Sequence, residues 1–306
     1  MMMTEPLLFT GLRGKLSRDE PLARHTSWRC GGKAEIAYVP ADRDDLATFV
    51  RQLAPGDALM AIGLGSNLLV RDGGVRGAVI LLHNPGGALA VADGLIYAEA
   101  GVASPKLARF AATHGCAEAE FLAGVPGTIG GALAMNAGCY GGETWRHVAR
   151  VEVLLRDGTF TVRTPEHYAI GYRTVRLANH SALDGVFTAA WFRFPQGDGI
   201  QARARIKELL ARRIATQPLN LPNAGSVFRN PEGDHAARLI EHCGLKGHAI
   251  GGARVSEKHA NFIVNPDGKA KASDVEALIE YVRKVVADRT GVRLEPEVQI
   301  VGERAS

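Results

Sequence analysis

Residues 124–142 read GVPGTIGGALAMNAGCYGG, and this stretch decides how the rest of the chain is interpreted. Seven of its nineteen residues are glycine, far more than an ordinary core element contains. Glycine occurs where the backbone takes positive φ or where another group must approach it closely. Gly130, Gly131 and Ala132 leave little side chain to keep a ligand away. The stretch therefore predicts a backbone surface that lies against a bound molecule.

A short helix is expected to begin at Pro126 and Gly127, because proline is favoured in the first turn of a helix. The N-terminus of such a helix offers unpaired N–H groups and the positive end of the helix dipole. Both suit a phosphate group or the electron-rich edge of a ring cofactor. The alternative interpretation is a tight turn with close helix packing, which needs no ligand.

A second glycine segment favours the ligand. Residues 61–71 read AIGLGSNLLVR, a short apolar strand that runs into a turn rich in glycine and small polar residues. Successive backbone N–H groups in such a turn can form a nest for a diphosphate. Leu68 stands where a G-x-G-x-x-G motif needs its third glycine, and no G-x-x-x-x-G-K-[ST] occurs, so Rossmann and P-loop sites are not indicated. Two anion-binding loops about sixty residues apart indicate one long dinucleotide held at both ends.

The composition is that of a soluble chain long enough for two domains, with 306 residues, 46% hydrophobic and 22% charged. The net charge of +4 and the isoelectric point of 8.9 fit anionic small ligands. Lysines and arginines are scattered, so nucleic-acid binding is not indicated. The N-terminus lacks the apolar region of a signal peptide, and no run approaches roughly 18 apolar residues. We therefore expect a cytoplasmic protein without a membrane partner.

No metal site is expected. The four cysteines contain no C-x-x-C pair, and no two histidines have metal-like spacing. Cys139 lies inside the glycine-rich stretch, where a small buried filler is favoured over a reactive thiol. His25, His83 and His259 are expected to be solvated or hydrogen-bonded.

The order of elements predicts an α+β protein and not a doubly wound sheet. In the first half, the pattern predicts the following elements: strands over 34–40, 59–62 and 78–83, two short strands around Ala90 and Tyr97, and helices over 42–53 and 104–114. Asp157-Gly158 predicts a hairpin between residues 151–155 and 159–163. Thr164-Pro165-Glu166 predicts a short helix that ends near Gly171-Tyr172-Arg173.

A second α+β unit is expected after a boundary at residues 196–199. Its predicted elements follow a strand over 186–194 and are a connector helix over 200–215, a helix over 234–243, a strand over 260–264 and a strand over 294–298. Ser273-x-x-Glu276 reads as the capping box of a further helix, which Gly291 ends.

Three polar residues stand out beside apolar segments. Arg173 could bind a carboxylate through a bidentate pair of hydrogen bonds, or it could be a surface cation at the end of a helix. Ser226 lies in no G-x-S-x-G elbow, so a proton donor is favoured over an acyl nucleophile, and an ordinary turn serine is the alternative. Glu297 is a charge in an otherwise apolar strand, or an exposed residue on an edge. Spacing alone does not assemble the three into one site.

Six motifs follow one another along the chain. They are GLGSNLLV from Gly63, GVPGTIGGALAMNAGCYGGE from Gly124, GYR from Gly171, QPLNLPNAGSVFRNP from Gln217, GLKG with GGARVSEKHANFIVN from Gly244, and LEPEVQIVG from Leu294. In identity and order they resemble the UDP-N-acetylenolpyruvoylglucosamine reductase family, in its shorter form. The resemblance covers almost the whole chain past Thr26.

The resemblance implies a fold and a division into domains. Residues 21–196 would form an FAD-binding domain of the vanillyl-alcohol oxidase or PCMH type, in two lobes of roughly 21–100 and 101–196. A mobile leader would precede it over residues 1–20. A connector helix and a smaller α+β substrate-binding domain would follow over residues 197–306.

The resemblance also implies non-covalently bound FAD, with NADPH as the reductant. The diphosphate would lie on the first glycine segment and the isoalloxazine near the second. The cofactor-binding residues by this match are Gly63, Leu64, Gly65, Ser66, Asn67, Leu68, Gly124, Val125, Pro126, Gly127, Gly130, Gly131, Ala132 and Asn136.

The reaction implied is the reduction of UDP-N-acetylglucosamine enolpyruvate to UDP-N-acetylmuramate, a step of peptidoglycan precursor synthesis. Ser226 matches the family's proton donor, and Arg173 and Glu297 match the pair that binds and polarises the enolpyruvyl carboxylate. The residues that match substrate-binding positions are Tyr172, Asn230 and Lys246. His259 stands where the longer form carries an amide side chain. A monomer acting on small molecules is expected.

Two other functions stay open on the residues alone. A flavin oxidase of the same fold would not need the set Arg173, Ser226 and Glu297. A non-catalytic nucleotide-binding module would keep the glycine loops without Ser226. Substrate-dependent reoxidation of the flavin distinguishes all three.

Overall fold

The first lobe is built around the buried strand β5 (Val75–Leu81), which sits between two parallel neighbours in a four-stranded sheet. Residues 9–305 are described in this computed structural model. The sheet has the order β1-β2-β5-β3, and its other strands are β1 (Lys15–Pro21), β2 (Lys33–Val39) and β3 (Leu59–Ile62). The strands predicted over 34–40, 59–62 and 78–83 are confirmed, and β3 delivers the first glycine segment.

Strand β1 shows that the predicted mobile leader over residues 1–20 is wrong in its last part. Residues 15–20 pair with β2 in an antiparallel ladder. Residues 1–8 of the expected leader lie outside the described residues. The sequence KLSRDEP gave no strand signal because an edge strand needs no apolar face, and backbone pairing alone holds it.

Helix α1 (Arg43–Arg51) covers one face of this sheet, and Phe49 stacks on Tyr38 with their ring centroids 4.4 Å apart. The predicted helix over 42–53 is confirmed. Asp42 is its N-cap and accepts a hydrogen bond from the Asp45 backbone N–H at 2.9 Å.

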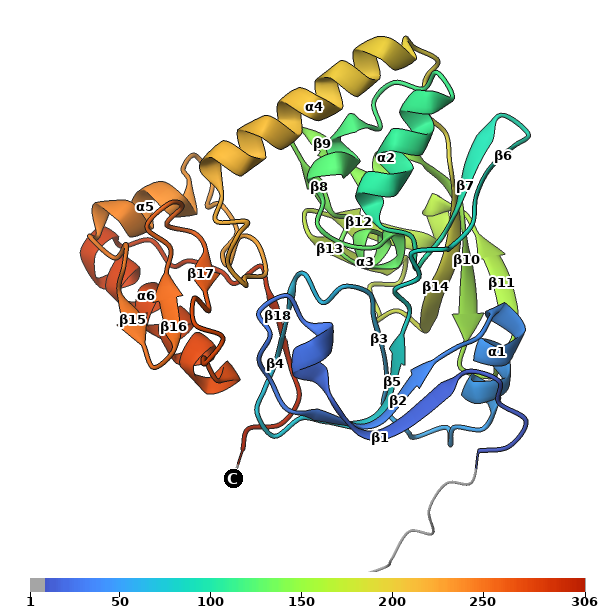
Figure 1. Ribbon diagram of the computed structural model, residues 1–306, viewed down its shortest axis with the longest axis horizontal. Helices are drawn as coiled ribbons and strands as arrows, with labels where there is room; N and C mark the ends of the chain where they lie inside the picture. The colour runs from blue at the N-terminus through green and yellow to red at the C-terminus, as the bar shows by residue number, and fades with distance from the viewer. Residues whose placement is uncertain (1–8, 306) are drawn as a thin grey trace, which may run out of the picture.

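The second lobe is a five-stranded antiparallel sheet in the order β11-β10-β14-β7-β6. Its strands are β6 (Leu89–Ala92), β7 (Leu95–Glu99), β10 (Val148–Leu155), β11 (Phe160–Arg163) and β14 (Gly185–Phe192). The hairpin predicted at Asp157-Gly158 is confirmed as β10–β11. Helices α2 (Ser104–Thr113) and α3 (Ile129–Ala134) lie on one side of this sheet (Figure 1).

A hairpin replaces the short helix that we predicted from Thr164. Only a single 3-10 turn, Pro165–His167, precedes strand β12 (Tyr168–Gly171), which pairs with β13 (Thr174–Leu177). Tyr168 is buried against Trp145 and Phe187, and this tertiary contact favours the strand. Arg173 therefore lies in a two-residue turn and not at a helix end.

The remaining short elements connect these parts. They are the strand pair β8 (Gly138–Cys139) and β9 (Gly142–Glu143) and the 3-10 helices Leu22–His25, Glu120–Gly124 and Thr144–His147.

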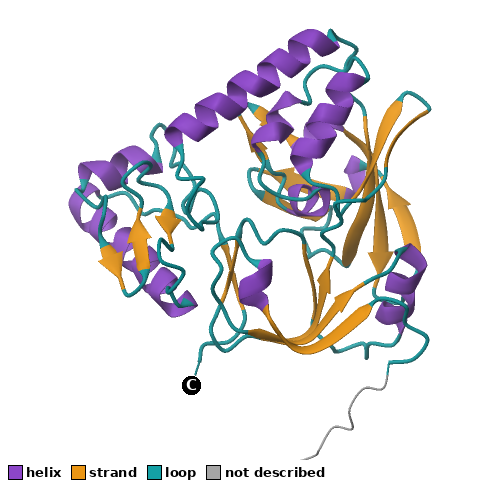
Figure 2. Cartoon of the chain, in the orientation of Figure 1, coloured by secondary structure: helices purple, strands orange, loops and turns teal. Residues whose placement is uncertain are grey.

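The long helix α4 (Gly199–Thr216) leads from the second lobe to a smaller C-terminal unit (Figure 1). That unit packs two helices against a three-stranded sheet, seen on the left of Figure 2. Its elements are α5 (Ala236–His242), β15 (Ala249–Ile250), β16 (Ala253–Val255), β17 (Ile263–Val264) and α6 (Ala272–Thr290). The helices predicted over 200–215 and 234–243 are confirmed, while the strand predicted over 260–264 is shorter.

Helix α6 is not capped by Ser273 and Glu276, so the predicted capping box is wrong. Asp72, from the first lobe, accepts hydrogen bonds from the Ala272 and Ser273 backbone N–H groups, both at 2.9 Å. Glu276 instead binds the Arg71 guanidinium through two bonds of 3.0 Å. Part of the cap thus comes from a residue two hundred positions away, and the local part comes from Asp274, which accepts from the Lys271 backbone N–H at 3.0 Å. Gly291 ends the helix as predicted, with φ of 74°.

The last strand returns to the first lobe. Strand β18 (Gln299–Val301) pairs in parallel with β4 (Leu68–Val70), which directly follows the first glycine segment. This pairing brings residue Glu297, just before β18, beside that segment. The predicted strand over 294–298 is thus displaced toward the C-terminus.

The second lobe buries His147 between Phe121 and Phe194, and this burial lowers the pKa of its imidazole. The folded protein favours the neutral ring, so its contribution to stability is complete above the unfolded pKa of about 6.5 and is lost as the pH falls below that value. We expect His147→Phe to lose less stability than the parent between pH 7.5 and 5.5 in urea unfolding. Burial also lowers the pKa of His259, so this residue maintains part of the pH dependence of stability in the variant.

The exposed His242 supplies the control, because His242→Asn should keep the parental loss of stability between the two pH values. An identical loss in His147→Phe and in the parent would contradict the assignment of this pH dependence to His147.

Candidate functional site

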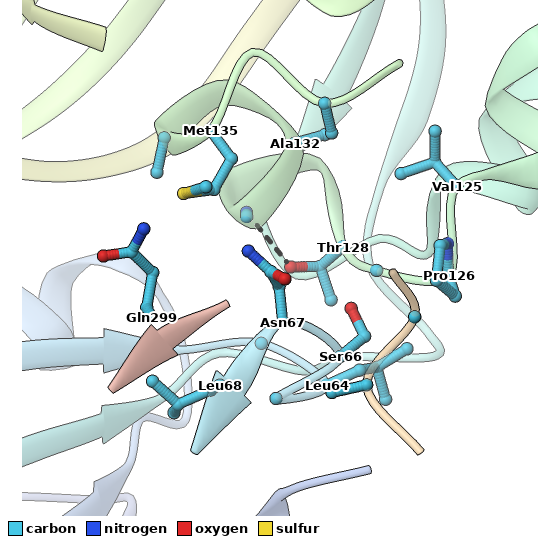
Figure 3. A pocket seen from close by; sticks show the side chains of 18 of the residues that line it. Leu64, Ser66, Asn67, Leu68, Val125, Pro126, Thr128, Ala132, Met135 and Gln299 are labelled. Atoms are coloured by element: carbon cyan, nitrogen blue, oxygen red, sulfur yellow. Dashed lines mark hydrogen bonds between the residues drawn. The ribbon is translucent and has the colours of Figure 1, made fainter. Parts of the chain in front are cut away.

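The two glycine segments line one cavity of about 400 Å³. The cavity lies where the two lobes and the C-terminal unit meet, and α3, α4 and β18 all contribute residues to it. Figure 3 shows side chains of both glycine segments around this space, Asn67 from the first and Thr128 and Met135 from the second, together with Gln299 of β18. The structure thus brings the two glycine segments together with Gln299, which lies more than a hundred positions from either segment in the sequence.

Most of the predicted site residues line this cavity. They are Gly63, Leu64, Gly65, Ser66, Asn67, Leu68, Gly124, Val125, Pro126, Gly127, Gly131, Ala132, Arg173, Ser226 and Glu297. Gly130 and Asn136 do not line it. A Cβ atom on Gly130 would lie 3.0 Å from the Cβ of Ala100, so this glycine serves packing against the second lobe.

Helix α3 begins later than predicted. It starts at Ile129, and Thr128 is its N-cap, with the side chain accepting from the Gly131 N–H at 3.4 Å. Pro126 and Gly127 therefore lie in the approach to the helix and not in its first turn. The helix has only six residues, and its backbone lies along the cavity wall.

Arg173 and Glu297 form an ion pair on the cavity wall. The Arg173 Nε–H donates to Glu297 Oε1 at 2.8 Å, and the two side chains are 18% and 12% exposed. Arg173 Nη2 also donates to the Gly138 carbonyl at 2.6 Å. A guanidinium held in this way presents a fixed positive charge at the cavity, where water screens it only partly.

Ser226 is brought beside this pair by main-chain bonds. The Glu297 N–H donates to the carbonyl of Val227 at 2.7 Å. Buried Asn261 fixes the serine segment, because its side chain accepts from the Phe228 N–H at 2.9 Å and donates to the Phe228 carbonyl at 2.8 Å. Gly225, with φ of 77°, turns the chain immediately before Ser226.

Asn67 connects the first glycine segment to the acid. Its side-chain Nδ2 donates to the Glu297 carbonyl at 3.1 Å, and its own carbonyl accepts from the Gln299 N–H at 3.0 Å. The loop that the sequence assigned to a diphosphate is therefore held against the residue that the sequence assigned to catalysis.

Sequence reasoning missed Arg213. This residue of α4 lines the main cavity and an adjoining cavity of about 330 Å³. Burial lowers its pKa, and its Nε–H donates to Gln217 at 2.9 Å. In the sequence Arg213 is one of several cations in a basic helix, and no local signal distinguishes it from the others. In the structure the other cations of this helix are exposed. Thr128, Met135, Phe262 and Gln299 also line the main cavity and were not predicted.

Three expected substrate contacts do not line the main cavity. Tyr172 precedes Arg173 in the hairpin turn, and burial together with the Glu297 carboxylate raises the pKa of its phenol. Asn230 accepts from the Ala236 N–H at 3.1 Å at the start of α5, and Lys246 pairs with Glu241 at 2.7 Å.

Cys139 also lines the main cavity, as a half-buried residue whose Sγ donates to the Phe121 carbonyl. Burial raises its pKa to about 11, which favours the predicted role as a filler over that of a reactive thiol. Among the described residues, no cluster of three or more His, Cys, Asp or Glu side chains could hold a metal ion. No helix in the described part has the length and hydropathy that crossing a membrane requires.

Comparison with known proteins identifies the family. The model of the UDP-N-acetylenolpyruvoylglucosamine reductase C-terminal domain matches residues 217–301, and that of an FAD binding domain matches residues 34–163. The reductase of Thiobacillus denitrificans is 57% identical, over 96% of this chain and 94% of its own length. This chain belongs to the UDP-N-acetylenolpyruvoylglucosamine reductase family. The reductase of Nitrosospira multiformis is 54% identical, over 97% and 91% of the two chains.

A solved reductase structure agrees with this membership. The reductase of Thermus caldophilus superposes with a TM-score of 0.77 at 32% identity, covering 94% of this chain and 99% of that one. The expected α+β fold with an FAD-binding domain of the PCMH type is confirmed. So is the expectation of an FAD-dependent oxidoreductase of the reductase family that acts in peptidoglycan synthesis.

The residues present fit FAD. A Cβ atom on Gly131 would meet only Thr128 Oγ1, at 3.7 Å, so the space beside this glycine is the cavity itself. Apolar side chains such as Ile62, Met135 and Phe262 line the same space and suit a flat ring system. The cavity would hold the cofactor along both glycine segments.

Gly131→Leu should therefore displace FAD, because its side chain would fill the cradle. Leucine is a good helix former, so α3 itself should persist. We expect at least a tenfold loss of flavin affinity, measured by the 450 nm to 280 nm absorbance ratio after gel filtration and by titration with FAD. The matched control is Gly56→Leu at an exposed position where a Cβ meets nothing within 4 Å. A Gly131→Leu protein as yellow as the parent would contradict the cradle.

Proposed function

We propose that this chain carries out the family's reaction, the NADPH-dependent reduction of UDP-N-acetylglucosamine enolpyruvate to UDP-N-acetylmuramate, with Arg173, Ser226 and Glu297 as its catalytic residues. One observation carries the assignment of roles. These three side chains come from the β12–β13 turn, the segment before α5 and the segment before β18, and all three line the cavity of the glycine segments.

Bound FAD would supply the hydride chemistry, passing on the two electrons that NADPH delivers. The enolpyruvyl double bond takes up a hydride at C3 and a proton at C2. Negative charge builds on the carboxylate of this group as C2 becomes a carbanion. Arg173, fixed by Glu297 and by main-chain carbonyls, would stabilise that charge more strongly in the transition state than in the ground state.

Ser226 would deliver the proton to C2. A serine hydroxyl is a weak acid, so it acts only when it is positioned at the carbanion. The support for this role is the rigidity of its segment, which Asn261 clamps on both sides of Phe228. Glu297 would complete the pair by orienting the guanidinium through which the carboxylate is bound and polarised.

The contacts to the UDP part follow from the same match. We propose Asn230 and Lys246 for this role, because they lie in the segments around α5 that follow Ser226. Tyr172, in the hairpin turn beside Arg173, is proposed as a further substrate contact. Lys246 would exchange its partner Glu241 for a phosphate of the substrate.

The division of the chain into a FAD-binding domain over 21–196 and a substrate-binding domain over 197–306 is part of this proposal. The cytoplasm as the site of action and a monomeric state are also proposed. The four unpaired cysteines suit a reducing compartment. Light scattering of the purified protein tests the monomer.

An anaerobic assay tests the function directly. The purified protein is bleached with one equivalent of NADPH, and UDP-N-acetylglucosamine enolpyruvate is then added while absorbance near 450 nm is followed. Rapid return of the flavin colour without oxygen supports the proposal. Bleaching without recovery would leave a flavoprotein with another acceptor, and a protein that binds no FAD would overturn the proposal entirely.

A further inference from the structure

The structure gives Asn136 a task different from the cofactor contact expected of it. We propose that Asn136 is a positioning residue, which holds Arg173 in the orientation that binds the enolpyruvyl carboxylate. This inference rests on the role of Arg173 in the proposed function.

Asn136 ends helix α3 in a left-handed conformation, with φ of 41°. Its N–H bonds to the Leu133 carbonyl at 3.4 Å, and the Ala137 N–H bonds to the Ala132 carbonyl at 2.9 Å. This pair of bonds is the Schellman motif, in which the left-handed residue is usually glycine and sometimes asparagine. Glycine would therefore serve the backbone here at least as well as asparagine does.

The side chain of Asn136 makes bonds that glycine could not make. It is 1% exposed and does not line the cavity. Its Nδ2 donates to the carbonyl of Gly171 at 3.1 Å and to Glu143 Oε2 at 3.2 Å, and its Oδ1 accepts from the Trp145 N–H at 3.1 Å. The amide is thus committed to protein partners on both of its polar atoms.

These bonds fix the turn that carries Arg173. Gly171 is the residue that enters the Tyr172-Arg173 turn, so Asn136 holds the turn at its base. The main-chain carbonyl of Asn136 also accepts from Arg173 Nη1 at 3.4 Å. Asn136 therefore holds Arg173 at the backbone and at the guanidinium together.

The turn needs such support because Arg173 itself has φ of 53°. The left-handed conformation is unfavourable for a residue other than glycine, because its Cβ crowds the following carbonyl oxygen. Without the Asn136 side chain, the turn could relax and displace the guanidinium. A misplacement of about 1 Å in a catalytic group can lower a rate about 10²-fold.

Asn136→Gly is the decisive variant, since it keeps the helix end and removes only the side-chain bonds. Asn136→Asp keeps the shape but turns a carboxylate oxygen toward Glu143 and the Gly171 carbonyl. Each is tested alone and with Arg173→Lys, in the two half-reactions measured separately by stopped flow. Asp93→Gly is the matched control, at an exposed left-handed turn residue of the β6–β7 hairpin.

We expect Asn136→Gly and Asn136→Asp to retain FAD and to be reduced by NADPH within twofold of the parent rate. Reoxidation by the enolpyruvyl substrate should slow at least tenfold, while Asp93→Gly changes neither step. Added to Arg173→Lys, Asn136→Gly should cause less than a further twofold loss, because both changes disturb the same group.

The inference would be overturned by loss of FAD from Asn136→Gly, by an equal slowing of both half-reactions, or by losses that multiply in the double variant. Reoxidation of Asn136→Gly at the parent rate would do the same. If Arg173→Lys itself left reoxidation unchanged, the proposed role of Arg173 would fail, and that failure is recognised independently of Asn136.

Discussion

Ser226→Ala should slow sugar-dependent reoxidation of the flavin by about 10²–10⁴-fold, the range typical of a lost general acid. NADPH-dependent bleaching should stay within about twofold of the parent, because that half-reaction needs no proton at the substrate C2. The hydroxyl adds no bond to the fold that the described contacts reveal, so the free energy of unfolding should change little. Single-turnover kinetics under anaerobic conditions measure both steps on one sample.

The control for this experiment is Ser181→Ala, an exposed serine whose hydroxyl bonds only within its own loop. It should leave both half-reactions at parental rates. If Ser226→Ala slowed the two half-reactions equally, the serine would be structural. The solvent deuterium isotope effect on reoxidation adds a second readout. A smaller isotope effect in Ser226→Thr than in the parent would mean that the threonine hydroxyl no longer transfers the proton in the slow step.

Arg173→Met should lower the rate of reoxidation by about 10²–10³-fold, as expected when a fixed donor to a developing charge is removed. Methionine nearly matches the length of the arginine stem but leaves the Glu297 carboxylate without its cation. The enolpyruvyl carboxylate would then face a negative charge. Both kcat and the affinity for the sugar substrate should fall, while flavin content stays the same.

A general structural effect is tested by measuring the free energy of unfolding of the same variant. The Arg173–Glu297 pair is mostly buried, and removing one partner of a buried pair can cost about 3–5 kcal/mol. The double variant Arg173→Met with Glu297→Gln removes the unpaired charge and should recover stability without recovering reoxidation. Recovery of reoxidation together with stability would show that the pair only holds the fold.

The sequence located the site more securely than it located the elements around it. Both glycine segments, Arg173, Ser226 and Glu297 were predicted, because each lies in a distinctive local motif. The hairpin that carries Arg173 was predicted as a helix end, since Thr164-Pro165-Glu166 is a good helix start. Packing of Tyr168 against Trp145 and Phe187 outweighed that local preference.

Residues with non-local roles escaped prediction. Arg213 is one of several cations on α4 in the sequence, and only the fold turns it toward the cavities. Asn261 accepts a hydrogen bond from the Phe228 N–H, and Asp72 accepts one from the N–H of Ser273 at the start of α6. Both bonds join residues that are far apart in the sequence. Edge strand β1 has a polar sequence, so its pairing with β2 left no signal in the residues.

The sequence by itself determined the family, the cofactor and the chemistry, because these depend on short runs whose residue types the chemistry requires. Only the tertiary structure decided how the runs are joined. The pairing of β18 with β4 sets Glu297 beside the first glycine segment, and Asn136 ties the second to the Arg173 turn. Such contacts link residues far apart in the chain, and their energy depends on the geometry of the folded backbone, which no local pattern contains.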